Sequence, residues 1–320
     1  MSSSAPGEDL LWLMHQLADG DWHSGEALAS EAGISRAALS KRVGQLSRFG
    51  VQVASRSGLG YQLLTPFEPL SLDALQLPDG LRGSVVRVTE STNADLLAAD
   101  AAHDPQIRFA EFQTAGRGRR GRVWQAPYGQ QLMMSLAWSF ASWPDDLGCL
   151  PLAVGCRLAE TLHRLGATTV QVKWPNDLVV DGCKLGGILL EHRGEIGGAC
   201  RVIIGLGLNL QRFADDRVPD QPWISLDQLL PVPVARNAVA AAISQALFAL
   251  LSDYPTAGFA ACRDSWQRLD ASFGRFVRII GVGPVIEGLA QGVDARGALQ
   301  VQAADGLHSV FSGEVSMRWA

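Results

Sequence analysis

The sequence predicts an α+β protein built from several domains. Its 320 residues are about twice the usual length of one domain, and 47% of them are hydrophobic, which is enough to fill more than one core. Apolar residues recur at helical spacing near the N-terminus, strand and helix patterns mix in the middle, and short strands separated by turns fill the C-terminal end. We therefore expect a small helical domain over residues 1–66, a mixed domain over 67–270 and a small β domain over 271–320.

Composition excludes several classes of protein. An odd number of cysteines without a C-x-x-C pair indicates reduced thiols rather than disulfides or a zinc site: Cys149, Cys156, Cys183, Cys200 and Cys262. Glu8 and Asp9 near the start argue against a secretory signal, and the longest apolar stretch, residues 238–251, is too short to span a bilayer. We expect a cytoplasmic protein with no membrane partner. The net charge of −5 also argues against a surface that coats nucleic acid, although it permits a local basic patch.

Three short helices are predicted near the N-terminus. The first spans residues 10–17, where apolar residues recur at helical spacing. Ser24 can cap a second helix and Ser35 a third, because serine side chains accept hydrogen bonds from the free N–H groups of a helix start. Gly33 between these two helices can take the left-handed conformation that a tight turn needs. A helix, a glycine-containing turn and a further helix ending near Phe49 are typical of a helix-turn-helix.

This segment also has a basic face. No Asp or Glu falls between Ala32 and Thr65, and two strands, 51–54 and 60–64, follow the helices as a wing. A solvated three-helix bundle without a role for the charge is the alternative, but the missing acids and the wing favour DNA binding. Phosphate contacts would supply affinity and the start of the third helix would read bases. The expected contact residues are Ser35, Arg36, Ser40, Lys41, Arg42, Arg48 and Arg56.

A loop rich in glycine and arginine follows the strand predicted over residues 108–113. Gly116, Gly118 and Gly121 satisfy the G-x-G-x-x-G fingerprint of dinucleotide binding, but no helix follows and no acidic residue ends a second strand, so the context excludes that interpretation. The intervening arginines are Arg117, Arg119, Arg120 and Arg122. Guanidinium groups bind carboxylates and phosphates, and glycines let a loop move. We therefore expect this loop to close over an anionic ligand.

Polar side chains gather where other strands of the mixed domain end. Ser91, Thr92 and Asn93 start a helix predicted over residues 94–102, after a strand over 85–88. Such residues commonly only cap a helix, but the same helix start also offers N–H groups and hydroxyls to a polar ligand.

Two lysines lie in motifs of their own. Lys173-Trp174-Pro175-Asn176-Asp177 ends a strand over 170–173, and we expect Trp-Pro to hold its backbone extended. Asp181-Gly182 predicts a hairpin that places Lys184 beside two glycines, where a ligand can approach the backbone. A lone lysine near a turn is more commonly solvated, so this position alone decides little. A further strand, over 202–207, leads to Asn209 through alternating glycines.

The C-terminal residues predict a small β-barrel. Alternating apolar residues indicate strands over 276–280, 285–289, 298–302 and 310–318, with turns at 281–284, 294–297 and 305–306.

Taken together, these motifs resemble those of a known protein family. Gly-Arg-Gly-Arg-Arg-Gly-Arg-x-Trp, Lys-Trp-Pro-Asn-Asp, Lys-Leu-Gly-Gly-Ile-Leu-x-Glu and Gly-x-Gly-x-Asn, in this order and spacing, resemble the biotin protein ligases. The helix-turn-helix in front makes the chain similar to the bifunctional type, which also represses the biotin operon. The resemblance covers essentially the whole chain. It implies a winged helix-turn-helix, a class II synthetase-like ligase domain with a mixed sheet, and an SH3-like C-terminal barrel.

The resemblance also implies a two-step reaction. Biotin and ATP give biotinyl-5′-AMP and pyrophosphate with the help of Mg²⁺, and a lysine of the biotin carboxyl carrier protein of acetyl-CoA carboxylase then takes the biotin. Biotinyl-5′-AMP would act as corepressor, promoting a homodimer that binds biotin operator DNA. Because phosphates supply most ligands of a nucleotide-bound Mg²⁺, no metal-ligating residues are expected.

Site residues are carried over from the family by position. The catalytic residues implied are Arg119, Lys184 and Lys173. Those implied to bind biotin are Ser91, Thr92, Asn93, Gln113, Arg117, Gly118, Arg119 and Lys184. Those implied to bind ATP or the adenylate are Gly116, Arg119, Arg122, Trp124, Asn176, Asp177, Asn209 and Trp223. Glu314 and Arg318 either reach back toward the nucleotide or acceptor, or belong to a structural cap.

Two other functions stay open at this point. One is a ligand-sensing transcription regulator that no longer transfers biotin, which the intact Arg119 and Lys184 argue against. The other is a lipoate ligase on the same central fold, which the Gly/Arg loop and the Lys-Trp-Pro-Asn-Asp motif disfavour.

Overall fold

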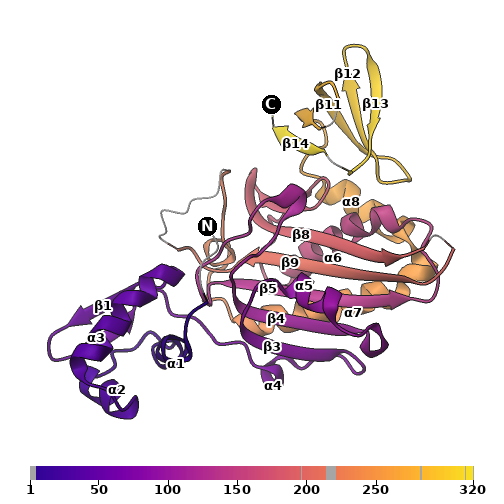
Figure 1. The fold of residues 1–320 in the computed structure, drawn as a ribbon. Helices are drawn as coiled ribbons and strands as arrows, with labels where there is room; N and C mark the ends of the chain where they lie inside the picture. Colours follow the sequence, from indigo (N-terminus) through magenta and orange to yellow (C-terminus); the bar gives the residue numbers. More distant parts are fainter. Residues whose placement is uncertain (1–4, 196, 214–220, 282, 314, 320) are drawn as a thin grey trace.

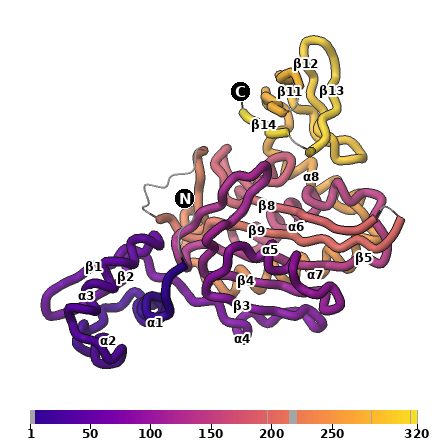
Figure 2. Tube along the Cα trace, in the orientation of Figure 1, coloured from indigo at the N-terminus to yellow at the C-terminus, as the bar shows by residue number. Residues whose placement is uncertain are grey.

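Three parts follow one another along the chain: helices with a small hairpin, a large sheet with helices on it, and a second, smaller sheet (Figure 1). The structure, a computed structural model, describes residues 5–195, 197–213, 221–281, 283–313 and 315–319. The tube in Figure 2 leads from the indigo helical part into the large sheet and ends in the yellow C-terminal sheet. The parts occur in the predicted order.

The N-terminal part has the predicted helix-turn-helix and wing. Its elements are α1 (Glu8–Gln16), α2 (Gly25–Glu31), α3 (Arg36–Gln45), β1 (Val53–Arg56) and β2 (Gly60–Leu63). The hydroxyls of Ser24 and Ser35 accept hydrogen bonds from the amides of Ala27 and Ala38, so both predicted caps are confirmed. A tight 3-10 turn follows α3 and ends at Gly50, whose φ of 74° favours glycine.

The central part is a seven-stranded mixed sheet in the order β3-β4-β5-β9-β8-β7-β6. Its strands are β3 (Arg82–Thr89), β4 (Gln106–Gln113), β5 (Gln131–Phe140), β6 (Gln171–Lys173), β7 (Asp177–Val180), β8 (Cys183–Gly194) and β9 (Cys200–Asn209). β3 and β4 are parallel and the other neighbours antiparallel. The register pairs Gln131 with Asn209, Gly207 with Gly187 and Gly187 with Asp177. Polar ends and glycines of several strands therefore lie at one end of the sheet.

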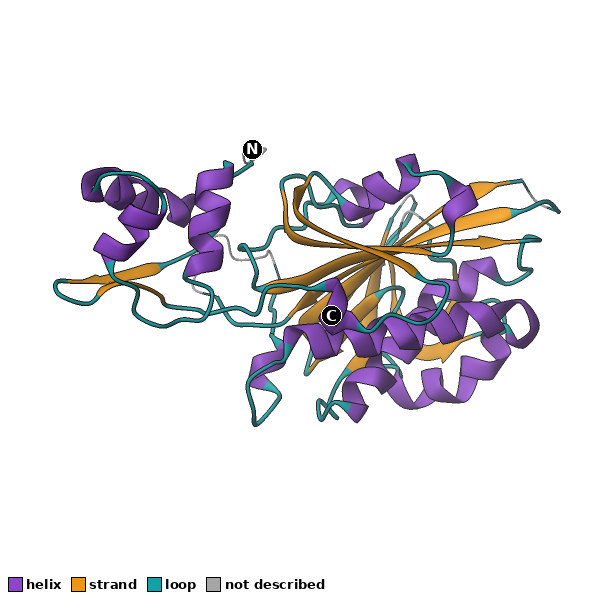
Figure 3. Cartoon of the chain, turned by 90° about the horizontal axis from the view of Figure 1, so that it is seen from below, coloured by secondary structure: helices purple, strands orange, loops and turns teal. Residues whose placement is uncertain are grey.

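Helices cover both faces of this sheet (Figure 3). They are α4 (Leu72–Leu75), α5 (Thr92–Ala98), α6 (Leu150–Arg164), α7 (Arg236–Ala257) and α8 (Arg263–Leu269). α6 and α7 pack against each other and share the main core with Leu136 and Ile204, whereas α5 packs on the opposite face through Ala137 and Ile203. Alternate residues of β5 and β9 thus point to different cores, as a strand buried on both faces requires.

α7 is longer than the apolar stretch that the sequence indicated. By length and composition its 22 residues could cross a membrane, but half of its apolar window is buried inside the protein. Ile243, Leu247 and Leu251 are fully buried in the main core. The packing is that of a core helix.

Two local predictions in the central part differ from the structure. The helix predicted to reach residue 102 ends at Ala98 and is followed by a separate 3-10 turn. Trp174 and Pro175 do not hold an extended backbone: with Asn176 they form the turn between β6 and β7, and their peptide bond is cis. The hairpin at Asp181-Gly182 is confirmed, with φ values of 49° and 80°.

The C-terminal part is an antiparallel sheet in the order β13-β12-β11-β10-β14. Its strands are β10 (Phe276–Ile280), β11 (Ile286–Val293), β12 (Leu299–Ala303), β13 (Gly306–Val310) and β14 (Ser316–Trp319). The single strand expected over 310–318 is wrong, because β13 ends at Val310 and the chain leaves the sheet before β14. Val282 of the predicted turn and Glu314 lie outside the described residues.

Aromatic side chains dock the N-terminal part onto the large sheet. Phe112 of β4 and Tyr128 belong to the same buried cluster as the leucines of α1. The ring centroids of Phe49 and Phe112 are 5.7 Å apart, and His15 Nε2 lies 2.9 Å from the Tyr128 hydroxyl. Because Phe112 directly precedes Gln113, this docking fixes the end of β4 where the cavity begins.

Candidate active site

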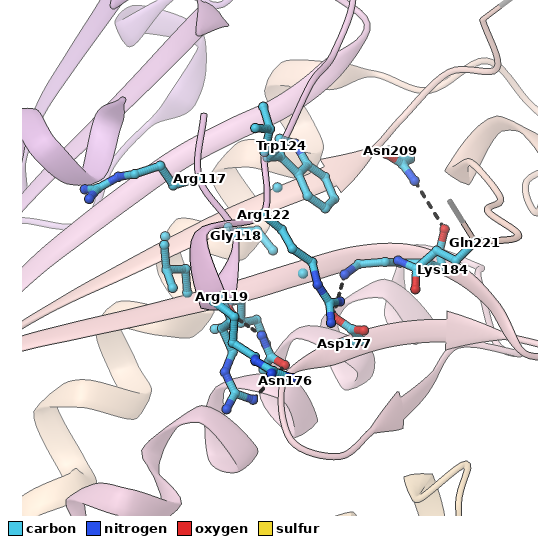
Figure 4. A pocket seen from close by; sticks show the side chains of 18 of the residues that line it. Arg117, Gly118, Arg119, Arg122, Trp124, Asn176, Asp177, Lys184, Asn209 and Gln221 are labelled. Carbon is cyan, nitrogen blue, oxygen red and sulfur yellow. Dashed lines mark hydrogen bonds and ion pairs between the residues drawn. The ribbon is translucent and has the colours of Figure 1, made fainter. Parts of the chain in front are cut away.

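A cavity of about 600 Å³ opens at this end of the large sheet. Its walls are the start of α5, the end of β4, the Gly/Arg loop, the β6–β7 turn, the start of β8, the end of β9 and the start of β14. The structure brings together nearly all the residues expected at a site, and Figure 4 labels nine of them. The predicted residues that line it are Ser91, Thr92, Asn93, Gln113, Arg117, Gly118, Arg119, Arg122, Trp124, Lys173, Asn176, Asp177, Lys184, Asn209, Trp223 and Arg318.

Gly116 is the exception, because it does not line the cavity. A Cβ at this position would lie 2.4 Å from the Trp124 carbonyl oxygen, and the Gly116 carbonyl accepts a hydrogen bond of 2.8 Å from the Trp124 amide. Its role in the structure is to let the two arms of the loop meet.

One end of the cavity holds a buried polar network. The Thr92 hydroxyl contacts Gln113 Oε1 at 3.2 Å and Ser135 Oγ at 2.7 Å, and Ser135 Oγ donates to Asn93 Oδ1 at 2.5 Å. Asn93 Nδ2 donates to Glu191 at 2.7 Å. Thr92, Asn93 and Ser135 are at most 4% exposed, so their orientations are fixed by these partners. Ser135 lies in the middle of β5, where the local pattern gave no sign of a functional residue.

Two glycines of β9 form the floor beside this network. A Cβ at Gly205 would lie 2.2 Å from Asn93 Oδ1, and one at Gly207 would lie 2.4 Å from the Trp124 ring. A side chain at either position would therefore displace a wall of the cavity. The alternating glycines that the sequence places before Asn209 are explained by this close approach.

The Gly/Arg loop (residues 116–124) is a small hairpin over the cavity. Arg117 and Val123 form a bridge, and the Gly118 amide donates to the Arg122 carbonyl at 2.7 Å. Arg120 and Gly121 at its tip have φ values of 57° and 69°. Arg120 is thus a non-glycine residue in the left-handed region, a conformation that the surroundings must maintain.

The loop arginines have different partners. Arg117 points away from Lys184 and Asp177 (Figure 4), and its Nη2 lies 3.5 Å from Glu191 Oε2. Arg119 Nη1 donates to Asn176 Oδ1 at 3.3 Å, and its Nη2 donates to the carbonyls of Ser312 and Gly313. Burial lowers the pKa of the Arg119 guanidinium, and neighbouring arginines lower it further, while Asp177 opposes the shift. Arg119 therefore links the loop, the β6–β7 turn and the C-terminal part.

Lys184 lies at the centre of the cavity. Its Nζ is 2.7 Å from Asp177 Oδ1 and 5.5 Å from the Trp124 ring centroid (Figure 4). The β7–β8 hairpin puts it there, and a Cβ at Gly187 would come within 3.2 Å of Nζ. The lysine is therefore not simply solvated: its ammonium is held in place between a carboxylate and an aromatic face.

Lys173 is a buried cation on the same wall. It is 6% exposed, and its Nζ lies 4.7 Å from the centroid of Trp319 on β14. Burial lowers its pKa to about 8, with nearby cations adding to the shift and Asp177 opposing it. This lysine is charged at neutral pH and close to losing that charge.

The far end of the cavity is aromatic and amide-lined. The Trp124 indole donates to Gln131 Oε1 at 2.8 Å, and Gln131 Nε2 donates to Asn209 Oδ1 at 2.8 Å. Phe213 stacks on Trp223 with centroids 4.6 Å apart. Gln131 and Phe213 were not predicted, because neither belongs to a recognisable motif. The result is a flat apolar surface next to fixed hydrogen-bonding groups, which suits a nucleobase.

The cavity has a strongly positive lining. Its cationic side chains are Arg117, Arg119, Arg120, Arg122, Lys173, Lys184 and Arg318, whereas Asp177 is the one carboxylate among its described lining residues. Within the described ranges, no cluster of three or more His, Cys, Asp or Glu side chains could hold a metal ion. The site can neutralise an anionic ligand such as a nucleotide.

The predicted DNA-contacting residues lie on α3, at its N-cap, in the 3-10 turn that follows it and on the wing. Most are exposed: Ser35, Arg36, Ser40, Lys41, Arg48 and Arg56. Arg42 is half-buried, and its Nε lies 2.8 Å from Asp9 of α1, so part of its charge is already compensated within the helical unit. The Ser35 hydroxyl is occupied as a cap.

Parts of the chain match known protein families. Residues 83–209 match the biotin/lipoate A/B protein ligase family, residues 272–318 the biotin protein ligase C-terminal domain and residues 10–62 a helix-turn-helix domain. Among solved structures, biotin protein ligase from Aquifex aeolicus in complex with biotin and ATP superposes with a TM-score of 0.64 at 23% identity, covering 75% of this chain and 99% of that one. That likeness shows the shared fold.

Full-length relatives then place the chain more closely. It is 38% identical over 314 residues to the bifunctional ligase/repressor BirA of Escherichia coli (strain K12), covering 97% of each chain. It is 28% identical to the protein of the same name from Bacillus subtilis (strain 168), covering 97% of this chain and 98% of that protein. The chain belongs to the biotin protein ligase family, and to its bifunctional ligase/repressor type.

Proposed function

We propose that this protein activates biotin with ATP, transfers it to a lysine of the biotin carboxyl carrier protein of acetyl-CoA carboxylase, and represses biotin biosynthesis genes as a DNA-binding protein. The observation that supports the enzyme best is the cavity itself. It combines a buried polar network, an aromatic, amide-lined surface and several cationic side chains in one space. Two anions, the biotin carboxylate and the ATP phosphates, must meet in such a place.

Biotin would enter with its ureido ring toward Thr92, Asn93 and Gln113. The ureido group has two N–H donors and one carbonyl acceptor, which a fixed network of hydroxyls and amides can satisfy. A ligand with an apolar ring, such as lipoate, would form no hydrogen bonds with these groups and would bind less tightly than biotin.

The first step would take place beside Lys184. An oxygen of the biotin carboxylate attacks the α-phosphorus of ATP, the bond from that phosphorus to the bridging oxygen breaks, and pyrophosphate leaves. Lys184, Arg119 and Arg122 would compensate the charge of the carboxylate and the phosphoryl oxygens as they approach. No side chain acts as nucleophile, so positioning and electrostatic stabilisation are the catalytic means.

Mg²⁺ accompanies ATP in this reaction. When bound, it neutralises phosphate charge. Asp177 Oδ and Asn176 Oδ1 are hard oxygen donors on the cavity wall and would face such an ion, with the phosphates supplying the remaining ligands. Asn209, Trp124 and Trp223 would hold the adenine side.

The second step is acyl transfer. The acceptor amine attacks the carbonyl carbon of biotinyl-5′-AMP, the bond from that carbon to the phosphate oxygen breaks, AMP leaves and a proton passes to solvent. The cations that bind the phosphate would then stabilise the leaving AMP.

Mass spectrometry of the acceptor tests this function. Purified protein, ATP, Mg²⁺ and a biotin carboxyl carrier domain should give a mass gain with biotin and none with lipoate. No gain despite bound ligand would instead indicate a sensor-regulator without transfer activity.

DNA binding should depend on the adenylate. We expect biotin plus ATP to tighten binding to operator DNA by about 10- to 100-fold, an ordinary range for coupled sites, at matched salt concentration. Biotin without ATP is the control. An affinity that is the same with biotin plus ATP as with biotin alone and with no ligand would contradict a corepressor role.

Lys173 should give ATP binding a pH dependence. Its pKa of about 8 means that the ammonium is present below pH 8 and lost above it. The KM for ATP should therefore rise severalfold between pH 7 and 9. In Lys173→Arg the cation persists throughout this range, so the rise should flatten; an equal rise in both proteins would assign the pH dependence to another group.

The finer architecture is also a proposal. The C-terminal sheet would close as an SH3-like barrel, the ligase part would be class II synthetase-like, and the domains would span residues 1–66, 67–270 and 271–320. The protein would act in the cytoplasm and bind its operator as a ligand-promoted homodimer.

A further inference from the structure

Besides the two carbonyls that Arg119 uses, one hydroxyl attaches the Gly/Arg loop to the C-terminal part. Arg120 Nη1 and Arg122 Nη2 each donate a hydrogen bond of 2.9 Å to Ser316 Oγ. Ser316 is the first residue of β14, where its backbone pairs with Ile280 of β10. The hydroxyl is therefore carried by a sheet that does not depend on the loop.

This contact explains how the loop keeps its shape. Arg120 has a φ of 57°, which costs free energy for a residue with a side chain. A cluster of arginines also repels itself, and the described part of the cavity lining offers only one carboxylate. The neutral acceptors of residues 312–316, namely two carbonyls and the Ser316 hydroxyl, take up three of these guanidinium groups.

We propose that Ser316 is a positioning residue that holds the Gly/Arg loop closed, so that the C-terminal part sets how long the adenylate stays in the cavity. The proposal rests on the proposed ligase function for its ligand. Ser316 touches neither reacting atom; it acts through Arg120 and Arg122. The contact is made at the start of β14, a strand separate from β13, which ends at Val310.

Ser316→Ala tests the proposal with two readouts. Trypsin should cut the loop of the ligand-free variant severalfold faster after Arg119, Arg120 or Arg122, because cleavage requires the loop to open. The half-life of preloaded biotinyl-5′-AMP should fall about tenfold, since two hydrogen bonds to charged groups are lost at a partly exposed site. The kcat for transfer at saturating biotin and ATP should change little.

Two matched variants separate the hydroxyl from the strand. Ser316→Thr keeps an acceptor and should restore both readouts. Ser312→Ala removes a neighbouring hydroxyl but leaves the carbonyl that Arg119 uses, so it should behave as the unsubstituted protein. Wild-type behaviour of Ser316→Ala in both readouts, or equal effects of Ser312→Ala, would overturn the proposal.

Arg120→Gly covers the case in which Ser316→Ala disturbs the C-terminal sheet. It removes one arm of the contact from the loop side and relieves the backbone strain, and the adenylate half-life should still shorten. An unchanged half-life would count against the contact. If the unsubstituted protein formed no adenylate, the ligase function would fail, while the comparison of tryptic cleavage rates would still decide the role of Ser316.

Discussion

Replacing Lys184 by Ala should lower the rate of adenylate formation by roughly 10²- to 10³-fold, the usual cost of removing one charge-stabilising group from a preorganised site. Lys184 Nζ is fixed by Asp177 at 2.7 Å and lies over the Trp124 ring. In the variant, Asp177 would remain in the cavity without its cation and would repel the incoming phosphates. Both effects act on the first step.

Biotin-dependent exchange of pyrophosphate into ATP measures this step directly. Lys184→Arg keeps a cation but not the compact ammonium, so it should recover only part of the activity. Arg268→Ala removes a cation from an exposed position on α8 that does not line the cavity, and it should leave exchange unchanged. Supplying biotinyl-5′-AMP directly should restore part of the transfer, because the first step is then bypassed while the leaving AMP still lacks one cation.

We expect the Lys184→Ala variant to keep the fold of the unsubstituted protein. Lys184 is bound at its backbone to Pro222 and Ile224, and these hydrogen bonds do not involve the side chain. The Tm of Lys184→Ala should therefore stay close to that of the unsubstituted protein. Normal pyrophosphate exchange in a folded Lys184→Ala would refute the role given to this lysine.

Residues in continuous motifs could be predicted from the sequence. Lys184 follows a turn whose type is determined by Asp181-Gly182, and the Gly/Arg loop combines mobility and charge in a few residues. Such signals are local. They indicate chemistry before the fold is known, and the cavity does contain these residues.

Residues that depend on packing could not be predicted. Ser135 joins Thr92 and Asn93 from the middle of a strand, and Ser316 meets loop arginines 194 and 196 positions away. A serine in a strand has no local mark that separates these roles from an ordinary position. The unbroken strand predicted over 310–318 is wrong for the same reason, because nothing in its local pattern marks the end of β13 at Val310.

Arg119→Gly should release the adenylate about 10²-fold faster than the unsubstituted protein. The side chain donates to Asn176 and to two carbonyls of the C-terminal part, and hydrogen bonds of a charged group are each worth about 1.5–3 kcal/mol. Its loss removes the bond to the β6–β7 turn and two bonds to the C-terminal part, whereas Ser316→Ala removes two bonds to the C-terminal part and leaves those of Arg119 in place. The larger effect is therefore expected at Arg119.

Release is best followed by trapping. Biotinyl-5′-AMP acylates free amines, so a lysine-rich bystander such as serum albumin should become biotinylated when the loop no longer retains the intermediate. The protein itself is a poor trap: it has three lysines, and two of them line the cavity. The bystander must therefore be added, and its labelling should rise with Arg119→Gly more than with Ser316→Ala.

The same measurement distinguishes retention from formation. If Arg119 only held the loop, pyrophosphate exchange would persist while the half-life of the bound adenylate collapsed. If its guanidinium also stabilised the phosphoryl oxygens, exchange would fall as well, because the cavity would lose a cation during the first step. Unchanged release together with reduced exchange would remove the retention role and leave Arg119 as a purely electrostatic group.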